Sequence, residues 1–310
     1  MSAPTLTIQE VFTAVGSRQP GTYDTACPFC SAKRKLRNQG LKVFRIWIAD
    51  ATTATFKCIH CDVRGRARGG DRRSTAKSAI GPAYSRQSES GYLAKSAKLE
   101  ADRTAAALGL WNQATDPAGT PVATYLASRG VTLPPGAAGG AIRWHPACPF
   151  GKGVTTPCMV ALVRDIHTDA PLAIHRTAID RHGRKAEHGG LSRMTLGPMA
   201  GGAVKLTPDA EVTLGLGIGE GLESTLSLRG LPGCEDLAVW ALLAANQLAA
   251  FPVLPGLDGL WIAVDHDLTG MAAAHTVRDR WNAAGVEVIS AKPQLIGCDL
   301  NDVVGAGHGR

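Results

Sequence analysis

Three acidic residues follow two apolar runs in the last third of the chain. Glu220 comes after the run 212–218, and Asp265 and Asp267 come after the run 260–264. Short apolar runs of this kind are typical of buried parallel strands, whose carboxyl ends meet at one edge of a sheet. Three carboxylates at such an edge repel one another unless a cation lies between them. Mg²⁺ suits the place because it takes one or two carboxylates together with substrate phosphates, so the pattern predicts phosphoryl-transfer chemistry.

Four of the eight cysteines form two Cys-x-x-Cys pairs, Cys27/Cys30 and Cys58/Cys61. Four thiolates complete a tetrahedral Zn²⁺ shell with no open position, so we predict a structural zinc site. A redox dithiol is the alternative, although a single pair would be enough for it. His60 could also replace one cysteine as a ligand. The other cysteines have no paired spacing and are expected to be buried thiols; they are Cys148, Cys158, Cys234 and Cys298.

Aromatic and basic residues alternate between the two cysteine pairs. The segments 44–49 and 54–57 read as strands of a small ribbon, after a short helix at 8–15. Phe44 and Trp47, among lysines and arginines, are suited to stacking on bases while the cations neutralise phosphates. The alternative is that these aromatic side chains simply pack the ribbon.

Composition predicts a protein of two or three domains with a polyanionic partner. The chain has 310 residues, a formal net charge of +7 and 45% hydrophobic residues, and its isoelectric point is about 9.1. The sequence has neither the ~20-residue apolar run of a membrane span nor a signal peptide, so we expect a cytoplasmic protein. The basic segment after Cys61 is poor in large apolar residues and is expected to be a flexible tether, either binding single strands electrostatically or serving only as a soluble linker.

The remainder of the chain predicts a multidomain α/β protein. A helix is expected at 93–113, with Leu99, Ala106, Leu110 and Trp111 as core contacts, and a second at 119–130. Strands are expected around 142–146, 159–164 and 173–179, the last two forming a hairpin with an exposed polar face. Beyond 210 the pattern is strand then helix, repeated. Four parallel strands are expected at 212–219, 237–243, 260–264 and 286–291, with helices at 222–229, 246–251 and 271–284 and a closing turn near Asn301.

The acidic motifs resemble those of the Toprim family, the fold shared by bacterial-type primases, topoisomerases and some nucleases. Its marks are Glu-Gly after the first strand and Asp-x-Asp-x-x-Gly after the third, which correspond here to Glu220-Gly221 and to the segment from Asp265 to Gly270. The segment 298–304 resembles the Asp-x-Asn-Asp closing motif of phage and plasmid primases. In that motif Asp299 and Asp302 either add a metal ligand or cap the last helix.

The middle of the chain resembles the segment that precedes Toprim in primases of phages, plasmids and integrative elements. The motifs are Tyr125-Leu-x-x-Arg-Gly, Arg143-x-His-Pro, His175-Arg-Thr, Gly183-x-Lys-Ala and Gly197-Pro-x-x-Gly-Gly. Guanidinium groups match phosphate oxygens, so a basic ridge facing the acids is expected. It would comprise Arg143, Arg164, Arg176, Arg181, Lys185 and Arg193. The expected domains are an N-terminal β zinc ribbon (1–65), a basic linker (66–95), an α+β primase-associated domain (96–208) and a Rossmann-like Toprim domain (209–305).

The resemblance implies a DNA primase, a nucleotidyltransferase that joins nucleoside triphosphates into a short primer on single-stranded DNA. Asp265 and Asp267 would hold Mg²⁺ or Mn²⁺, and Glu220 would ligate a metal or accept the proton of the attacking 3′-hydroxyl. Glu223, about one helical turn later, either supports this site or is an ordinary partner of the helix dipole.

The implied partners are single-stranded DNA, nucleoside triphosphates and a separate replicative helicase, because the sequence has no Gly-x-x-x-x-Gly-Lys-Ser/Thr motif. A mobile genetic element is the implied origin. Two other functions stay open: a Toprim-type metal-dependent nuclease, and a non-catalytic zinc-ribbon protein that binds single-stranded DNA.

Overall fold

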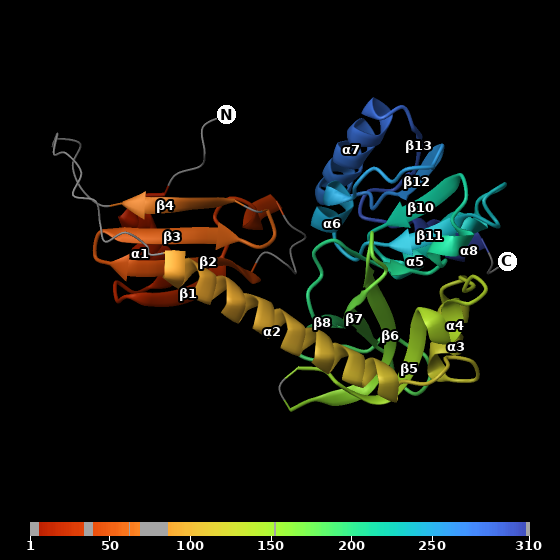
Figure 1. Ribbon diagram of the computed structural model, residues 1–310, viewed down its shortest axis with the longest axis horizontal. Coiled ribbons are helices and arrows are strands. Elements are labelled where there is room, and N and C mark those ends of the chain that lie inside the picture. The colour runs from red at the N-terminus through yellow and green to blue at the C-terminus, as the bar shows by residue number, and fades with distance from the viewer. Residues whose placement is uncertain (1–5, 34–39, 62, 69–85, 152, 308–310) are drawn as a thin grey trace. The chain divides into compact units, whose positions relative to one another are not determined.

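The computed structural model describes residues 6–33, 40–61, 63–68, 86–151 and 153–307. The chain divides into two compact units, Met1–Ala83 and Tyr84–Arg310 (Figure 1). Within the described residues, none of the helices combines the length and the apolar character needed to cross a membrane.

In its described residues, the first unit is a four-stranded antiparallel sheet with one helix and a short 3-10 turn. The helix α1 (Ile8–Val15) begins with a capping box between Thr7 and Glu10. The strands β1 (Gly21–Ala26), β2 (Lys42–Asp50), β3 (Thr53–Cys58) and β4 (Arg64–Arg68) follow one another in the sheet, and the 3-10 turn is Ser31–Lys33. The predicted helix and the two predicted ribbon strands are thus confirmed.

The strand β4 was not predicted, because its arginines suggested a flexible tether. Arg64, Arg66 and Arg68 alternate with Gly65 and Ala67, and the alanine is fully buried. A Cβ atom at Gly65 would lie 2.6 Å from the ring of Phe56, so only glycine lets the strand pair this closely with β3. The linker predicted at 66–95 therefore begins inside β4 and ends inside a helix, while its residues 69–85 lie outside the described part of the chain.

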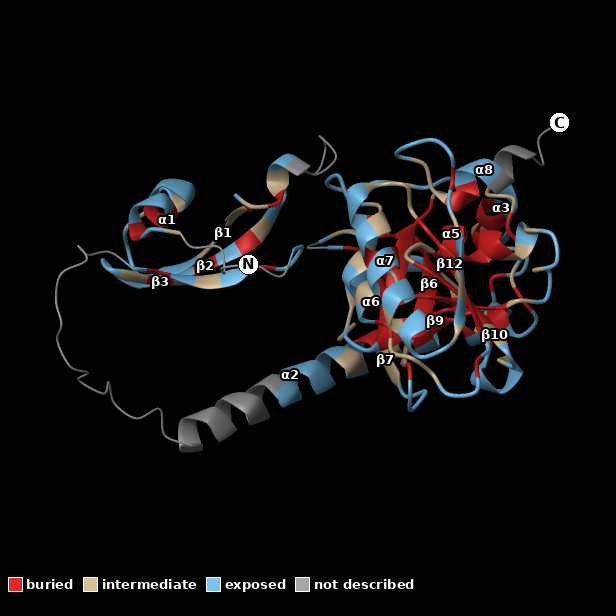
Figure 2. Ribbon diagram, turned by 90° about the horizontal axis from the view of Figure 1, so that it is seen from above, coloured by how far each residue is buried: buried red, intermediate tan, exposed pale blue. Residues whose placement is uncertain are grey.

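The second unit is built on one nine-stranded sheet (Figure 2). Its first half comprises the strands β5 (Ile142–Pro149), β6 (Thr155–Asp165), β7 (Pro171–Ala178), β8 (Arg193–Leu196) and β9 (Gly202–Lys205), all antiparallel to their neighbours. The helices of this half are α2 (Arg86–Gln113), α3 (Pro121–Ser128) and α4 (Ala137–Gly140). The predicted helix at 119–130 is confirmed, with Thr120 as its N-cap and Pro121 in its first turn.

The β6–β7 hairpin is confirmed, but the exposed polar face predicted for it is wrong. Ala107 and Trp111 of α2 pack in one core cluster with Val160 and Ile174 of the hairpin, which covers that face. The same packing confirms Leu110 and Trp111 as core contacts of α2 and corrects the other two. Leu99 is 53% exposed and Ala106 is also exposed, because the buried side of the helix passes through Ala107 and Trp111.

The second half of the sheet is parallel, in the order β13-β12-β10-β11. Its strands β10 (Gly215–Gly219), β11 (Ala238–Ala241), β12 (Gly259–Ala263) and β13 (Glu287–Ala291) confirm the four predicted strands. The helices are α5 (Leu222–Ser227), α6 (Ala245–Ala250), α7 (Leu268–Ala283) and α8 (Leu300–Gly307), with 3-10 turns at Asp209–Glu211 and Leu228–Gly230. The strand β9 pairs antiparallel with both β11 and β6 and so joins the two halves.

Candidate metal and nucleotide site

The three predicted acids lie at the carboxyl ends of two adjacent parallel strands. Gly219, the last residue of β10, lies opposite Ala263, the last residue of β12. Glu220 follows the first strand directly, and Asp265 and Asp267 follow the second. All three side chains are partly buried. The parallel pairing thus brings them to one edge of the sheet.

The turn between β12 and α7 fixes the two aspartates. Asp267 is the N-cap of α7, where its Oδ1 accepts hydrogen bonds from the backbone N–H groups of Thr269 (3.0 Å) and Gly270 (2.9 Å). The N–H of Asp267 donates to the carbonyl oxygen of Asp265 at 2.8 Å. A Cβ atom at Gly270 would lie 2.6 Å from that same oxygen. A glycine is therefore required for the helix to start this close to Asp265.

A second loop supports this turn. The N–H of His266 donates to the carbonyl of Cys298 (3.0 Å), and the N–H of Gly297 donates to the carbonyl of His266 (2.8 Å). The loop then enters α8 through a reciprocal cap, in which Asp299 and Asp302 each accept the other's backbone N–H, at 3.1 and 3.0 Å. Helix capping, one of the two roles predicted for these aspartates, is therefore observed.

Asn301 is a residue that sequence reasoning missed. Its side chain is buried, and its Nδ2 donates to the carbonyl of Arg129 (2.6 Å) and to the hydroxyl of Ser227 (3.1 Å). This packing of α8 against α5 and α3 explains why a helix, one of the predicted alternatives, follows Asp299 rather than a closing turn alone. The signal was an asparagine between two capping aspartates in the closing motif.

Glu223 forms a buried network between the two halves of the sheet. Its carboxylate accepts a hydrogen bond from the Tyr125 hydroxyl (2.5 Å) and pairs with the guanidinium of Arg193 (2.7 Å), while its side chain is only 4% exposed. Burial raises the pKa of Glu223, but the charge of Arg193 and the bond from Tyr125 outweigh this effect and lower the pKa to about 2. The carboxylate is therefore ionised in this network and holds Arg193 against α5.

Two further groups interact with this charged region, namely His175 and Lys185, the second of which belongs to the predicted basic ridge. Burial, followed by the positive charge of Arg193, lowers the pKa of His175 to about 4, so its imidazole is neutral. Desolvation and the charge of Arg193 also lower the pKa of Lys185. Of the predicted basic ridge, the structure thus brings Lys185 and Arg193 together near Glu223.

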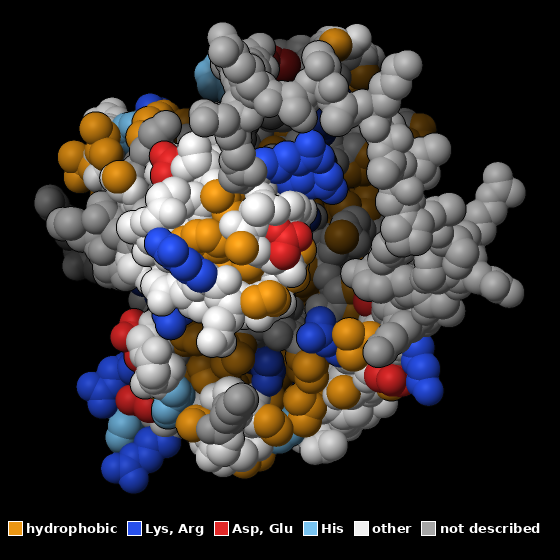
Figure 3. All heavy atoms as spheres, turned by 90° about the vertical axis from the view of Figure 1, so that its left-hand side faces the viewer, with side chains coloured by type: hydrophobic (Ala, Val, Ile, Leu, Met, Phe, Trp, Pro, Cys, Tyr) orange, Lys and Arg blue, Asp and Glu red, His pale blue; other side chains and the backbone are white. Residues whose placement is uncertain are grey.

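The contacts of Arg143 and Arg176 lie within the fold. Because Arg176 is buried, its prediction as a nucleotide-binding residue is corrected, whereas that of the partly exposed Arg143 stays a prediction. The guanidinium of Arg143 lies 4.4 Å from the ring centre of Trp111 and donates to the carbonyl of Gly139 at 2.8 Å. Arg176 is 5% exposed and donates to the carbonyls of Pro149 and Thr195. On the face shown in Figure 3, lysine and arginine side chains lie in several separate groups.

The remaining ridge residues lie apart from the network. Arg164 forms an ion pair with Asp169 at 3.3 Å, and Arg181 is exposed and donates to His182 at 3.0 Å. The sequence identified these residues by charge alone, which does not show where a side chain points.

The four paired cysteines meet in the first unit. Their sulfur atoms all lie within 4.8 Å of one another, with Cys27 and Cys61 3.9 Å apart and Cys30 and Cys58 3.8 Å apart. Tetrahedral ligation with Zn–S bonds of about 2.3 Å requires sulfurs about 3.8 Å apart, so the cluster fits zinc. Among the described residues, the group holds these cysteines and leaves out His60. Burial raises the pKa of the Cys27 thiol, so ionised sulfurs there need a bound cation.

The ribbon aromatics separate into a core residue and a surface residue. Phe44 is fully buried, and its ring lies 5.3 Å from that of Phe56. The prediction that Phe44 stacks on bases is therefore wrong, because packing uses its ring. Trp47 is 41% exposed on the same strand and remains available to a ligand.

Two family models match the second unit, one over each half of its sheet. Residues 215–308 match the family model described as "Toprim domain". The C-terminal part of the chain is a Toprim domain. Residues 101–206 match a domain of unknown function, DUF7146. The curated proteins include no significant match to the chain.

Several solved primase structures resemble the chain at low similarity. The primase fragment of the bacteriophage T7 primase-helicase protein is 14% identical, with a TM-score of 0.39, 93% of this chain covered and 96% of that chain. A DNA primase domain from Pseudomonas aeruginosa is 13% identical (TM-score 0.40; 61% and 68% covered). The Escherichia coli primase catalytic core is 12% identical (TM-score 0.40; 66% and 75% covered).

Proposed function

We propose that this protein is a DNA primase that makes short primers on single-stranded DNA by metal-dependent nucleotidyl transfer. The observation that carries the proposal is the placement of Glu220, Asp265 and Asp267 at the ends of adjacent parallel strands of a Toprim domain. A zinc-competent cysteine cluster on the same chain supports it, since a structural zinc site stabilises a small unit that can present residues to DNA.

The acids at the sheet edge fit a hard divalent cation. Carboxylate oxygens are the ligands that Mg²⁺ prefers, and Glu220, Asp265 and Asp267 would hold it. A Mg²⁺ or Mn²⁺ ion held by these acids would supply positive charge to offset the charge that develops on the leaving pyrophosphate.

The chain's own residues orient and move protons around this site. Glu220 accepts the proton of the attacking 3′-hydroxyl or completes the metal site. Asp267 is held in place by the α7 backbone, so it enters the reaction already oriented. Lys185 and Arg193, beside Glu223, supply positive charge for phosphates of template or triphosphate.

The first unit would select the DNA and the template would arrive unwound. Trp47 is exposed on β2 and is suited to stacking on a base. The single strand would come from a separate helicase, and a phage, plasmid or other mobile element is the proposed setting.

Primer synthesis on a defined template tests the function. The chain is incubated with single-stranded DNA, ribonucleotides and Mg²⁺ or Mn²⁺, and the products are separated by size. We expect new oligonucleotides, and we expect Glu220→Gln and Asp267→Asn to abolish them. Arg184→Ala is the control, because Arg184 is exposed and pairs with Asp180 in the middle of the chain.

The other functions give different results in the same assay. Shortened template would indicate a nuclease, and binding without any product would indicate a DNA-binding protein. Primer synthesis that survives Asp267→Asn would show that the acids are not the site.

A further inference from the structure

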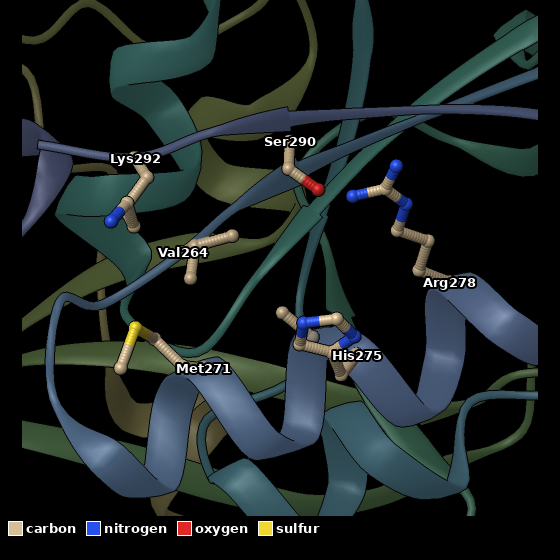
Figure 4. Close-up of a pocket in the computed structure, with 7 residues that line it drawn as sticks. Val264, Met271, His275, Arg278, Ser290 and Lys292 are labelled. Carbon is tan, nitrogen blue, oxygen red and sulfur yellow. The ribbon is translucent and has the colours of Figure 1, made fainter.

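A cavity of about 240 Å³ lies in the Toprim domain between α7 and the edge strand β13 (Figure 4). It adjoins the acidic turn, because Val264 directly precedes Asp265 and Lys292 contacts His266, which lies between the two aspartates (Nζ to Nε2, 3.2 Å). The residues that line it are Val264, Met271, Ala274, His275, Arg278, Ser290 and Lys292.

The lining combines apolar surface with positive charge. Val264, Met271 and Ala274 are apolar, Arg278 and Lys292 are cationic, and the lining residues include no carboxylate. Figure 4 shows the Arg278 guanidinium facing the Ser290 hydroxyl and the Lys292 ammonium on the opposite side of the view, with Val264 between them and Met271 on the Lys292 side. The cavity therefore offers an apolar surface flanked by donors for an anion.

The Arg278 guanidinium is available to a ligand. Within the part of the chain that the structure describes, the side chains of Arg278 and His275 make no hydrogen bond or ion pair, and both residues are exposed. A guanidinium without a carboxylate partner beside a hydroxyl and an ammonium matches the oxygens of a phosphate. Inorganic phosphate alone would leave the apolar residues uncovered.

We propose that this cavity binds a phosphorylated nucleoside, with its phosphate on Arg278, Ser290 or Lys292 and its base or sugar on Val264, Met271 and Ala274. The subsite is separate from the acids, since none of Glu220, Asp265 and Asp267 lines it. The nucleoside phosphate could be a free nucleotide or one unit of a nucleic-acid strand. Only this choice of source rests on the proposed primase function, because the binding itself requires no catalysis.

Calorimetric titration of the full chain with AMP tests the subsite, in buffer free of Mg²⁺ and Mn²⁺ so that the acids hold no metal. We expect AMP to bind more tightly than adenosine or inorganic phosphate, because only AMP uses both kinds of surface. At least one of Arg278→Glu and Lys292→Glu should weaken AMP binding about tenfold or more, because each reverses one of the two cationic charges that line the cavity. Arg184→Glu, a matched charge reversal on an exposed arginine elsewhere, should leave it unchanged.

Competition identifies the source of the nucleotide. A short oligodeoxythymidylate that displaces AMP would show that the subsite takes a unit of a strand, and one that does not would assign the subsite to free nucleotide. AMP binding that is absent, or unchanged in both charge-reversed variants, would overturn the proposal. The Asp267→Asn variant should lose primer synthesis and keep AMP binding, so a failure of the proposed function is distinguishable from a failure of the subsite.

Discussion

At the scale of single residues, Glu223 shows how a charge can be buried without losing its ionisation. Its carboxylate receives a hydroxyl and a guanidinium, and both come from the half of the sheet that precedes the Toprim domain. Removing one partner of such a pair leaves the other charge poorly solvated. The pair therefore holds Arg193 in place, and removing its carboxylate should lower the stability of the second unit.

Replacing Glu223 with Gln should destabilise the second unit. The Arg193 side chain is 39% exposed and so keeps part of its hydration, which reduces the expected loss to about 1–2 kcal/mol in the free energy of unfolding. Urea unfolding at pH 7 measures it. Glu211→Gln, at an exposed acid, is the control and should change the midpoint little. Equal midpoints for the two variants would contradict the importance of the pair.

His175 should make the stability of the second unit depend on pH. Its pKa is about 4 in the folded protein against an ordinary 6.5, so only the unfolded chain binds a proton in between. The stabilisation is therefore complete above pH 6.5 and is lost as pH falls towards 4, by roughly 3 kcal/mol in total. Urea unfolding at pH 7 and 4.5 measures the loss. His175→Gln should show a smaller loss; an identical pH slope would refute the assignment.

The sequence identified the site acids and cysteines but not their supporting contacts. Glu220, Asp265 and the paired cysteines belong to short sequence motifs, which can be recognised without knowledge of the fold. The roles of Glu223 and Asn301 depend on partners 98 and 172 residues away along the chain, Tyr125 and Arg129. The contrast between Phe44 and Trp47 likewise depends on which face of one strand is covered.

At the scale of elements, the junction of β12 with α7 depends on the absence of a side chain. A methyl group at Gly270 would meet the carbonyl oxygen of Asp265 at 2.6 Å and its Cβ at 3.0 Å. Gly270→Ala should therefore move α7 away from the acidic turn. We expect a loss of about 1–3 kcal/mol in unfolding free energy, measured in urea, and a loss of primer synthesis.

Gly109→Ala is the matched control. Gly109 lies inside α2, and an added Cβ there meets nothing within 4 Å. Alanine is the better helix former, so this change should raise stability by about 0.5–1 kcal/mol. Similar losses in both variants would mean that the close approach at Gly270 has no special effect.

The elements that were predicted correctly carry their own local pattern, and those that were missed do not. Three of the parallel strands, β10, β11 and β12, contain no polar side chain, and α3 begins with Thr-Pro. The alternation of polar and apolar residues in β4 is hard to recognise from the sequence, because its inward residues are only glycine and alanine. The length of α8 depends on tertiary packing through Asn301, which no local pattern records.

At the scale of the whole molecule, the two units should respond differently to loss of metal. The first unit has a small core around Phe44, Ile46 and Phe56, next to the cysteine cluster, and a unit of this size often needs a metal to stay folded. We expect chelation of zinc, or Cys58→Ser, to unfold it while the second unit persists. Limited proteolysis with mass spectrometry would show cleavage within 1–83 only. Cys234→Ser is the control, and a first unit that resists protease after chelation would refute the zinc assignment.

The pairing of β9 with both β6 and β11 limits how the two matched regions can be recombined during evolution. The regions that match the two families meet inside one hydrogen-bonded sheet. If recombination replaced one region alone, the strands at the junction would lose their partners and expose two unpaired edges. Such hybrids would tend to aggregate before any enzymatic defect could be seen. We expect the domain of unknown function and the Toprim domain to be inherited together. The first unit, which carries the cysteine cluster and lies outside that sheet, can be exchanged separately.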